Sequence, residues 1–502
     1  MRKRRVEFII AIILMISLYL LLLSSNQSVK VICFLLYFSA MMVSMYSLML
    51  ENRSPQHTLL WMYVLTFLPV FGYLFYLFSG QLYMKGYFLK SKRKKDREEW
   101  KKLLQKEPTP DLAFLQDNQH SFAKFAIQVS PTPISTSSDV LILKNGEETF
   151  TEIIRRLKKA KTFIHIEYYI FRSDRLGKLI MKILMAKAKK GINVLFIFDA
   201  AGSRKIASDD LLAMRAAGIK VQAFSPLKYG FFNQKLNFRN HRKMIIIDGE
   251  IGFVGGLNVG VEYLGEDNRV GFWRDTHILL KGEAVYSLHM VFLLDWEYIS
   301  GEKILDRYST AKKGISDGII DGAVQVVATG PDTQQGLMSD FYYAMIASAT
   351  KSIWIASPYF IPDESIRTAL RVAAAKGIEV RIIVPEINDG FLTQYASRSY
   401  FSELLRYGVE IYLYKKGFLH QKVIIVDGNL ATLGTANMDM RSFHLNFEVN
   451  VFMYGTSSIR DLVAHYEEDL EDSEKISPVQ YYKRGFAERS KESFARLFSG
   501  VL

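Results

Sequence analysis

The chain has 502 residues, enough for two or three domains, and nearly half of them are apolar, so a large core is possible. Its net charge of +13 suits an anionic partner such as nucleic acid, anionic lipid or a phosphorylated substrate, although a generally basic surface explains it equally well. A single cysteine, Cys33, excludes an internal disulfide and a cysteine metal cage. We expect no metal and no other cofactor.

Three apolar runs occupy the first 80 residues of the chain, at residues 6–23, 31–50 and 58–78. Glu7 interrupts the first run, and the other two contain no charged residue. A helix needs about 20 apolar residues to cross the hydrocarbon core of a bilayer, so each run approaches spanning length. The pattern predicts a transmembrane anchor of two to three helices over residues 1–85.

The flanking charges leave the topology of this anchor open. Basic residues at positions 2–5 and again at 85–97 both favour the cytoplasmic side, which three full spans cannot satisfy. The third run, with Pro69 and Gly72, could be re-entrant, or the first run could be irregular. A cleaved signal peptide is disfavoured because residues 24–26 make a poor cleavage site and more apolar runs follow. The basic stretch could also attract anionic headgroups, and we treat residues 86–121 as a juxtamembrane linker.

A strand–helix–strand pattern occurs twice in the remaining chain, which indicates parallel α/β units and a duplication. The first copy predicts a strand at 161–171, a helix at 177–190 and a strand at 193–199, and the second predicts them at 351–362, 365–376 and 379–385. We therefore expect two similar halves, at residues 122–315 and 316–502.

Each half contains the same polar motif at the equivalent point of the repeat. His241 and Lys243 are followed after four residues by Asp248 and, after six more, by a Gly-Gly-Leu-Asn segment that ends at Asn258. The second copy has identical spacing and consists of His420, Lys422, Asp427 and Asn437.

The spacing predicts how the side chains of each motif meet. The apolar residues after each lysine end in Asp-Gly, a strong signal for a hairpin turn. Residues two apart on a strand face the same side, so the histidine and lysine of each motif share a face. Folding back at the turn brings Asn258 close to His241, and Asn437 close to His420.

Asp248 and Asp427 lie at odd spacing from their histidines and at the predicted turn, which indicates residues that shape the turn. We nevertheless include both in the predicted catalytic set, which consists of His241, Lys243, Asp248, His420, Lys422 and Asp427. Asn258 and Asn437 are the predicted phosphate-binding residues.

The duplicated motif resembles the mark of the phospholipase D superfamily, HxKxxxxD followed by G-[GST]-x-N, and the resemblance covers residue 122 to the end. It implies an α/β fold of two α/β/α sandwich halves related by pseudo-twofold symmetry and preceded by transmembrane helices. The N-terminal segment also resembles the anchor of bacterial cardiolipin synthases, although the extra apolar run at the start departs from it. The residues that carry this second resemblance are Pro55, Trp61, Pro69, Gly72, Tyr76 and Gly80.

The chemistry of a phosphodiester needs a neutral nucleophile, a proton for the leaving alkoxide and cations around the phosphoryl oxygens. The resemblance implies that His241 forms a phosphohistidine and that His420 is the general acid and later the base, although the sequence leaves the two assignments interchangeable. Asp275 and Glu448 are the expected carboxylates that orient the histidines, with a structural salt bridge as the alternative. We also expect Tyr168, Tyr359, Phe443 and His444 to line the pocket.

The resemblance implies transfer of a phosphatidyl group between two phosphatidylglycerol molecules, giving cardiolipin and glycerol in the cell membrane. The basic clusters favour a catalytic domain on the cytoplasmic side, although the side of the membrane stays open. Phosphatidylglycerol and anionic membrane lipids are the expected partners, and nucleic acid is not. A phospholipase D or a phosphatidylserine synthase is the first alternative. A nuclease fits the positive charge but not the apolar runs, and a lipid-binding scaffold with decayed motifs does not fit two complete motifs. The oligomeric state stays open.

Overall fold

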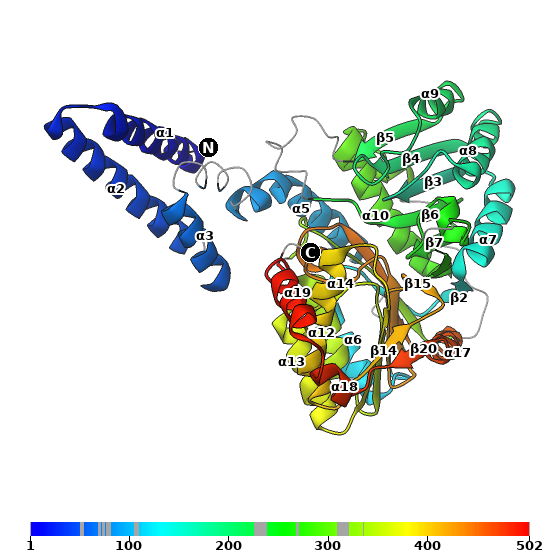
Figure 1. The fold of residues 1–502 in the computed structure, drawn as a ribbon. Helices are drawn as coiled ribbons and strands as arrows, with labels where there is room; N and C mark the ends of the chain where they lie inside the picture. The colour runs from blue at the N-terminus through cyan, green and yellow to red at the C-terminus, as the bar shows by residue number, and fades with distance from the viewer. Residues whose placement is uncertain are drawn as a thin grey trace. The chain divides into compact units, whose positions relative to one another are not determined.

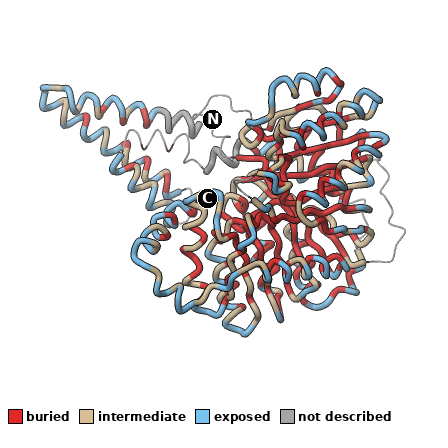
Figure 2. Tube along the Cα trace, turned by 45° about the vertical axis from the view of Figure 1, so that its right-hand side comes forward, coloured by how far each residue is buried: buried red, intermediate tan, exposed pale blue. Residues whose placement is uncertain are grey.

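The computed structural model describes residues 2–50, 55–68, 72, 76, 82–104, 110–224, 238–267, 271–308, 321–334 and 336–500. The chain forms two units, an N-terminal unit (Met1–Ser91 with Leu227–Leu236) and a larger unit (Lys92–Pro226 with Asn237–Leu502). Within the larger unit, burial is concentrated in the strands of two sheets (Figure 2).

The N-terminal unit contains the helices α1 (Arg2–Leu23), α2 (Gln27–Met49) and α3 (Pro55–Phe67), and α5 (Leu82–Leu104) continues from it into the larger unit. The side chain of Asn26 caps α2 by accepting a hydrogen bond from the backbone N–H of Ser28 at 2.9 Å. Helices α1 and α2 pack together, but large apolar side chains along the rest of α2 are exposed. Such exposure is stable in lipid and costly in water.

Helix α2 is the one helix in the described part of the chain that is both long and apolar enough to cross a membrane. The apolar parts of its neighbours, Ile9–Leu23 and Thr58–Phe67, are shorter. One span is therefore supported, and the predicted second and third spans are not confirmed. Much of the third run, including Pro69, lies outside the described residues, as does Gly80.

The first sheet of the larger unit has seven strands in the order β2-β9-β7-β6-β3-β4-β5. Strands β3, β4 and β5 are parallel, as predicted, whereas the other neighbours pair antiparallel. The bounds are β2 (Ser138–Lys144), β3 (Phe163–Tyr168), β4 (Asn193–Asp199), β5 (Lys220–Phe224), β6 (Lys243–Ile247), β7 (Ile251–Gly255) and β9 (Thr276–Gly282).

Helices cover both faces of this sheet (Figure 1). One face packs against α7 (Asn145–Lys159), α8 (Arg175–Ala188) and α9 (Ser208–Ala216), and the other against α10 (Glu283–Ser300). All six residues of β3 are consequently buried, which explains its continuous run of large side chains.

The second sheet has nine strands in the order β1-β10-β19-β17-β16-β11-β13-β14-β20. Its seven inner strands repeat the order of the first sheet, and β1 and β20 extend the edges, so the predicted duplication is confirmed. The bounds are β1 (Ile134–Ser135), β10 (Ala323–Thr329), β11 (Ser352–Ala356), β13 (Glu379–Pro385), β14 (Glu410–Tyr414), β16 (Val423–Val426), β17 (Leu430–Gly434), β19 (Glu448–Tyr454) and β20 (Ser473–Lys475).

The helices of the second sheet follow the same plan. Helices α6 (Asp117–Val129), α12 (Leu337–Ala347) and α13 (Glu364–Ala375) pack into the core on one face, and α17 (Ser458–Glu471) covers the other. Even the helix caps are repeated, because Asp174 caps α8 and Asp363 caps α13, each accepting at 3.0 Å from a backbone N–H three residues on.

One segment lies elsewhere than the predicted division suggests. Residues 122–135 were assigned to the first half, yet β1 pairs with β10, and Phe122 packs against Phe341 and Phe452. Helix α6 and strand β1 therefore complete the second sheet and its core. The boundaries of the two halves stay a prediction.

Candidate active site

Two hairpins present the predicted motifs, as the Asp-Gly signals indicated. Strand β6 folds back on β7 with Ile247 opposite Ile251, and β16 folds back on β17 with Val426 opposite Leu430. The two histidines lie just before β6 and β16 and are almost completely buried.

The turn aspartates tie each hairpin to the neighbouring strand. Asp248 and Asp427 have positive φ angles of 56° and 52°, and each accepts hydrogen bonds from three consecutive backbone N–H groups. Burial alone would raise the pKa of these carboxyls, but the backbone N–H groups outweigh it and the pKa is lowered. The donors, at 2.7–3.0 Å, are Lys161, Thr162 and Phe163 for Asp248, and Thr350, Lys351 and Ser352 for Asp427. None of them belongs to a histidine–lysine pair.

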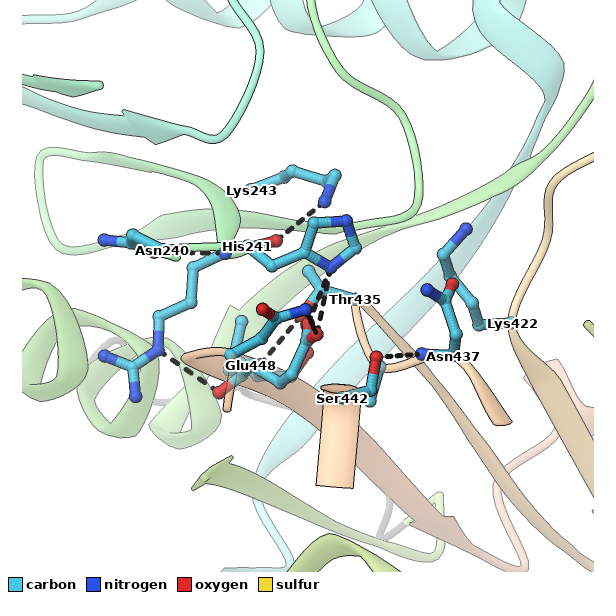
Figure 3. A network of polar contacts seen from close by, with 12 residues as sticks. Asn240, His241, Lys243, Lys422, Thr435, Asn437, Ser442 and Glu448 are labelled. Atoms are coloured by element: carbon cyan, nitrogen blue, oxygen red, sulfur yellow. Dashed lines mark hydrogen bonds and ion pairs between the residues drawn. The ribbon is translucent and has the colours of Figure 1, made fainter. Parts of the chain in front are cut away.

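The histidine of each half meets a carboxylate of the other half. Nδ1 of His241 lies 2.9 Å from a carboxylate oxygen of Glu448 (Figure 3), and Nδ1 of His420 lies 2.7 Å from one of Asp275. Both carboxylates are fully buried. A carboxylate can only accept here, so each Nδ1 donates its proton and each Nε2 carries the free lone pair.

Backbone pairing between the halves creates these crossed contacts. The N–H of His241 donates to the carbonyl of Phe447 at 2.9 Å, and that of His420 donates to the carbonyl of Arg274 at 2.7 Å. In the second case the pairing extends into two short strands, β15 (Gly417–Leu419) and β8 (Phe272–Arg274), which run parallel. The residue before each carboxylate is thus bonded to the opposite histidine.

The lysines of the motifs are buried beside the histidines. Nζ of Lys243 donates to the carbonyl of His241 at 2.7 Å, and Nζ of Lys422 donates to that of His420. Burial lowers the pKa of Lys243 to about 7 and that of Lys422 to about 8. The charge of Lys422 contributes to the lowering at Lys243, so the motifs of the two halves share one electrostatic field.

Comparison with known proteins agrees with this arrangement. A family described as "Cardiolipin synthase, PLD-like domain" matches residues 153–273 and 342–472, one segment for each motif. A probable cardiolipin synthase, YwiE, of Bacillus subtilis is 57% identical over 505 residues and covers all of both chains. This chain belongs to the cardiolipin synthase family.

A second sequence relative and a solved structure are also similar to this chain. The cardiolipin synthase of Geobacillus kaustophilus is 48% identical over 457 residues, which is 90% of each chain. Among solved structures, the fold is similar to that of a phosphatidylserine synthase from Haemophilus influenzae, with a TM-score of 0.56 and 14% identity. That match covers 77% of this chain and all of the other, and it supports the fold.

In this cardiolipin synthase family member, burial sets the charge state of both imidazoles. Burial lowers the pKa of His420 to about 3, and Lys422 adds to the effect. Burial also lowers the pKa of His241, although Glu448 opposes it. Both rings are therefore neutral near pH 7. The two carboxyls have lowered pKa values, because the neighbouring lysines and the hydrogen bonds from the histidines outweigh the effect of burial, so they are ionised.

The predicted phosphate-binding asparagines have partners within their own halves. Oδ1 of Asn258 accepts from the backbone N–H of Ile170 at 3.0 Å, and its Nδ2 donates to the hydroxyl of Tyr263 at 3.2 Å. Nδ2 of Asn437 donates to Asp439 at 3.0 Å. Each amide nitrogen has a second hydrogen that these hydrogen bonds do not use.

Two aromatic side chains beside the histidines were not predicted. The ring of Tyr169 packs edge-on against His241, and the indole of Trp273 packs against His420, each with ring centroids 5.0 Å apart. Tyr169 follows β3, which pairs with the motif strand β6, and Trp273 lies two residues before Asp275, so their proximity depends on the fold. The expected pocket residues Tyr168 and Phe443 instead pack in the hydrophobic cores.

A buried network of ion pairs that was not predicted supports the segment containing the first motif. Arg242, between the catalytic-motif residues, pairs with Asp295 of α10. Asp295 also pairs with Lys92 of α5, which in turn bonds Asp332 and Asp96. Lys92 lies in the basic stretch that could attract anionic headgroups, but its own side chain is only 3% exposed and pairs with these carboxylates.

A buried aspartate also holds the segment that contains the second motif, through different partners. Here Gln421 stands between histidine and lysine, and it donates to Asp469 of α17 at 2.6 Å. Arg274 from the first half donates to the other oxygen of Asp469, also at 2.6 Å. In both halves, therefore, an arginine and a buried aspartate on the covering helix fix the segment that contains the motif.

Proposed function

We propose that this protein is a cardiolipin synthase that transfers a phosphatidyl group from one phosphatidylglycerol to another and releases glycerol. The observation that carries the proposal is the pair of crossed imidazole–carboxylate contacts, which engage Nδ1 of each histidine and leave each Nε2 free for chemistry beside two buried lysines. The names of close relatives that cover 90–100% of the chain support the choice of lipid.

In the first step, Nε2 of His241 attacks the phosphorus of phosphatidylglycerol and forms a P–N bond. The P–O bond to the terminal glycerol breaks, and the leaving alkoxide takes the proton from Nε2 of His420. Glu448 stabilises the positive charge that develops on His241, as the carboxylate of a catalytic triad does. The products of this step are free glycerol and a phosphatidyl-histidine.

In the second step, a hydroxyl of another phosphatidylglycerol loses its proton to Nε2 of His420 and attacks the phosphorus. The P–N bond breaks, cardiolipin leaves, and both imidazoles return to their starting state. His420 is thus acid in one step and base in the other, and its contact with Asp275 suits it to both states.

The phosphodiester itself prepares the site for the first step. A general acid must be protonated, whereas burial keeps His420 neutral near pH 7. A bound phosphodiester brings a negative charge, which raises the pKa of adjacent imidazoles and ammonium groups. Lys243, Lys422 and the free amide hydrogens of Asn258 and Asn437 then bind the phosphoryl oxygens.

We also propose that α2 and its neighbouring apolar helices form a multi-pass anchor, with the larger unit in the cytoplasm and its two halves related by a pseudo-twofold axis. The basic residues on both sides of the apolar runs support this orientation. We propose the same domain division as from the sequence: an anchor (1–85), a linker (86–121) and two halves (122–315 and 316–502). Helix α6 and strand β1 pack on the second sheet.

Incubating the full chain in nanodiscs with phosphatidylglycerol labelled in its terminal glycerol tests the function. We expect cardiolipin and free labelled glycerol in equal amounts, and neither product with His241→Ala. Phosphatidic acid in place of cardiolipin would identify a hydrolase of the phospholipase D type. Phosphatidylserine formed when serine is added would identify a phosphatidylserine synthase.

A further inference from the structure

Two neighbouring helices of the second half expose a group of large apolar side chains. Helix α14 (Phe391–Arg398) packs beside the last helix, α19 (Phe486–Arg496), as Figure 1 shows. We call the exposed apolar residues on and next to these two helices the C-terminal apolar surface. It consists of Ile387, Phe391, Phe486, Phe494 and Leu497, which are 54–84% exposed.

Packing fixes the outward direction of this surface. Phe486, Phe494 and Leu497 recur eight and three positions apart, so they lie on one face along the axis of α19 and its C-terminal end. The opposite face is anchored, because Ala495 is completely buried in a cluster with Ala396 and Tyr400 of the second half. The helix therefore turns its apolar side away from the protein core.

Polar contacts hold the same orientation. Nζ of Lys491 donates to the hydroxyl of Tyr395 at 3.3 Å, and the guanidinium of Arg496 donates to the carbonyl of Ser399 at 3.4 Å. A rotation that buried the phenylalanines would break both contacts. The exposure of the apolar side is thus a stable property of the fold.

Basic residues border the apolar side chains. Lys483 just before α19 and Arg489 near the start of α19 are exposed. An exposed helix with large apolar residues on one side and cations beside them is the pattern of helices that lie in the interface of an anionic bilayer.

A residue between two members of this surface contributes to the electrostatics of the active site. Ile387 and Phe391 flank Asp389, whose carboxylate accepts a hydrogen bond from the hydroxyl of Tyr359 at 2.7 Å. Burial lowers the pKa of Lys422, and Asp389 is one of the nearby carboxylates whose charge opposes this effect. Asp389 therefore lies within electrostatic range of the catalytic motif.

We propose that the C-terminal apolar surface inserts into the anionic bilayer and holds the edge of the active site at the level of the lipid headgroups. The choice of an anionic bilayer rests on the proposed function, and the basic border and the nearby motif favour it over a second copy of the chain. Docking of this kind brings a lipid phosphate to the histidines without extracting the acyl chains from the membrane.

Site-directed fluorescence on the full chain in phosphatidylglycerol nanodiscs tests this. In a Cys33→Ser background, an environment-sensitive probe is attached at Phe486→Cys or Phe494→Cys. Leu212→Cys on α9 is the matched control, because Leu212 is an apolar residue that is 60% exposed elsewhere on the larger unit. We expect a shift of emission to shorter wavelength and quenching by acyl-chain nitroxides at positions 486 and 494, and neither at position 212.

Turnover of a monomeric short-chain phosphatidylglycerol reports separately on folding and on the proposed reaction, since it needs no docking. The probe is attached only to variants that keep this turnover. If the parent shows no turnover, the criterion is an unfolding temperature equal to that of the parent. Emission at 486 and 494 equal to that at 212 would overturn the proposal. A shift to shorter wavelength without quenching by lipid nitroxides would also overturn it, and would indicate a contact with another copy of the chain.

Discussion

Nδ1 of His241 lies 2.9 Å from a carboxylate oxygen of Glu448, a residue 207 positions further along the chain. The reciprocal contact, between His420 and Asp275, is 2.7 Å long. Neither half can therefore orient its own histidine. Since each half supplies the carboxylate for the other, the reacting geometry exists only when both halves are folded and docked.

Glu448→Gln and Asp275→Asn should each lower kcat by about 10²–10⁴-fold, because an amide does not hold the imidazole in the required tautomer or stabilise its cation. The measurement is cardiolipin formation by purified protein. Glu474→Gln is the matched control, since that carboxylate is 71% exposed, and its activity should equal that of the wild type. An unchanged kcat in the two buried variants would show that these contacts are only structural.

The roles of the two histidines can be separated with a phosphatidyl ester of nitrophenol, whose leaving group needs no proton. We expect His420→Ala to release one equivalent of nitrophenolate and retain a phosphohistidine, because its nucleophile is intact. His241→Ala should do neither. Mass spectrometry of the modified peptide checks the site of attachment, and a phosphohistidine at position 420 would reverse the assignment.

The buried lysines predict the alkaline limb of the pH profile. Their lowered pKa values, about 7 for Lys243 and about 8 for Lys422, mean that the free enzyme loses these positive charges as the pH rises through 7 to 8. Because the proposed mechanism uses these cations to bind the phosphate, kcat/KM should fall across this range. An activity that stays constant to pH 9 would contradict it, and the profile of Glu474→Gln should match the wild type.

The hairpins were predictable from sequence because the turn signal and the strand pattern are local. Strand β4 and strand β13 begin and end where the pattern places them. The crossed pairing was not predictable, since it depends on backbone bonds between segments far apart, such as His241 with Phe447. Charge was misleading at Lys92, because a lysine in a basic stretch looks exposed unless its buried acidic partners are known.

The turn aspartates give a prediction that separates structural from catalytic roles. Asp248→Asn and Asp427→Asn each replace a charged acceptor of several backbone N–H bonds, so they should destabilise the larger unit by about 1–3 kcal/mol. At a temperature where the variants are folded, kcat should stay within about twofold of the wild type, since these carboxylates bond to strand starts rather than to the histidines. Thermal unfolding and cardiolipin formation are measured together. A loss of kcat without a loss of stability would place them in the chemistry.

The buried lysine of α5 gives the last prediction. Lys92→Met removes the cation shared by Asp295 and Asp332 and leaves buried carboxylates without it, which should cost about 3–5 kcal/mol of stability. Lys94→Met, two positions away with a side chain that is 79% exposed, should change stability by less than about 0.5 kcal/mol. Thermal unfolding of the full chain in nanodiscs compares the two. Equal stability in both variants would mean that the ion pairs of Lys92 with Asp295 and Asp332 do not stabilise the larger unit.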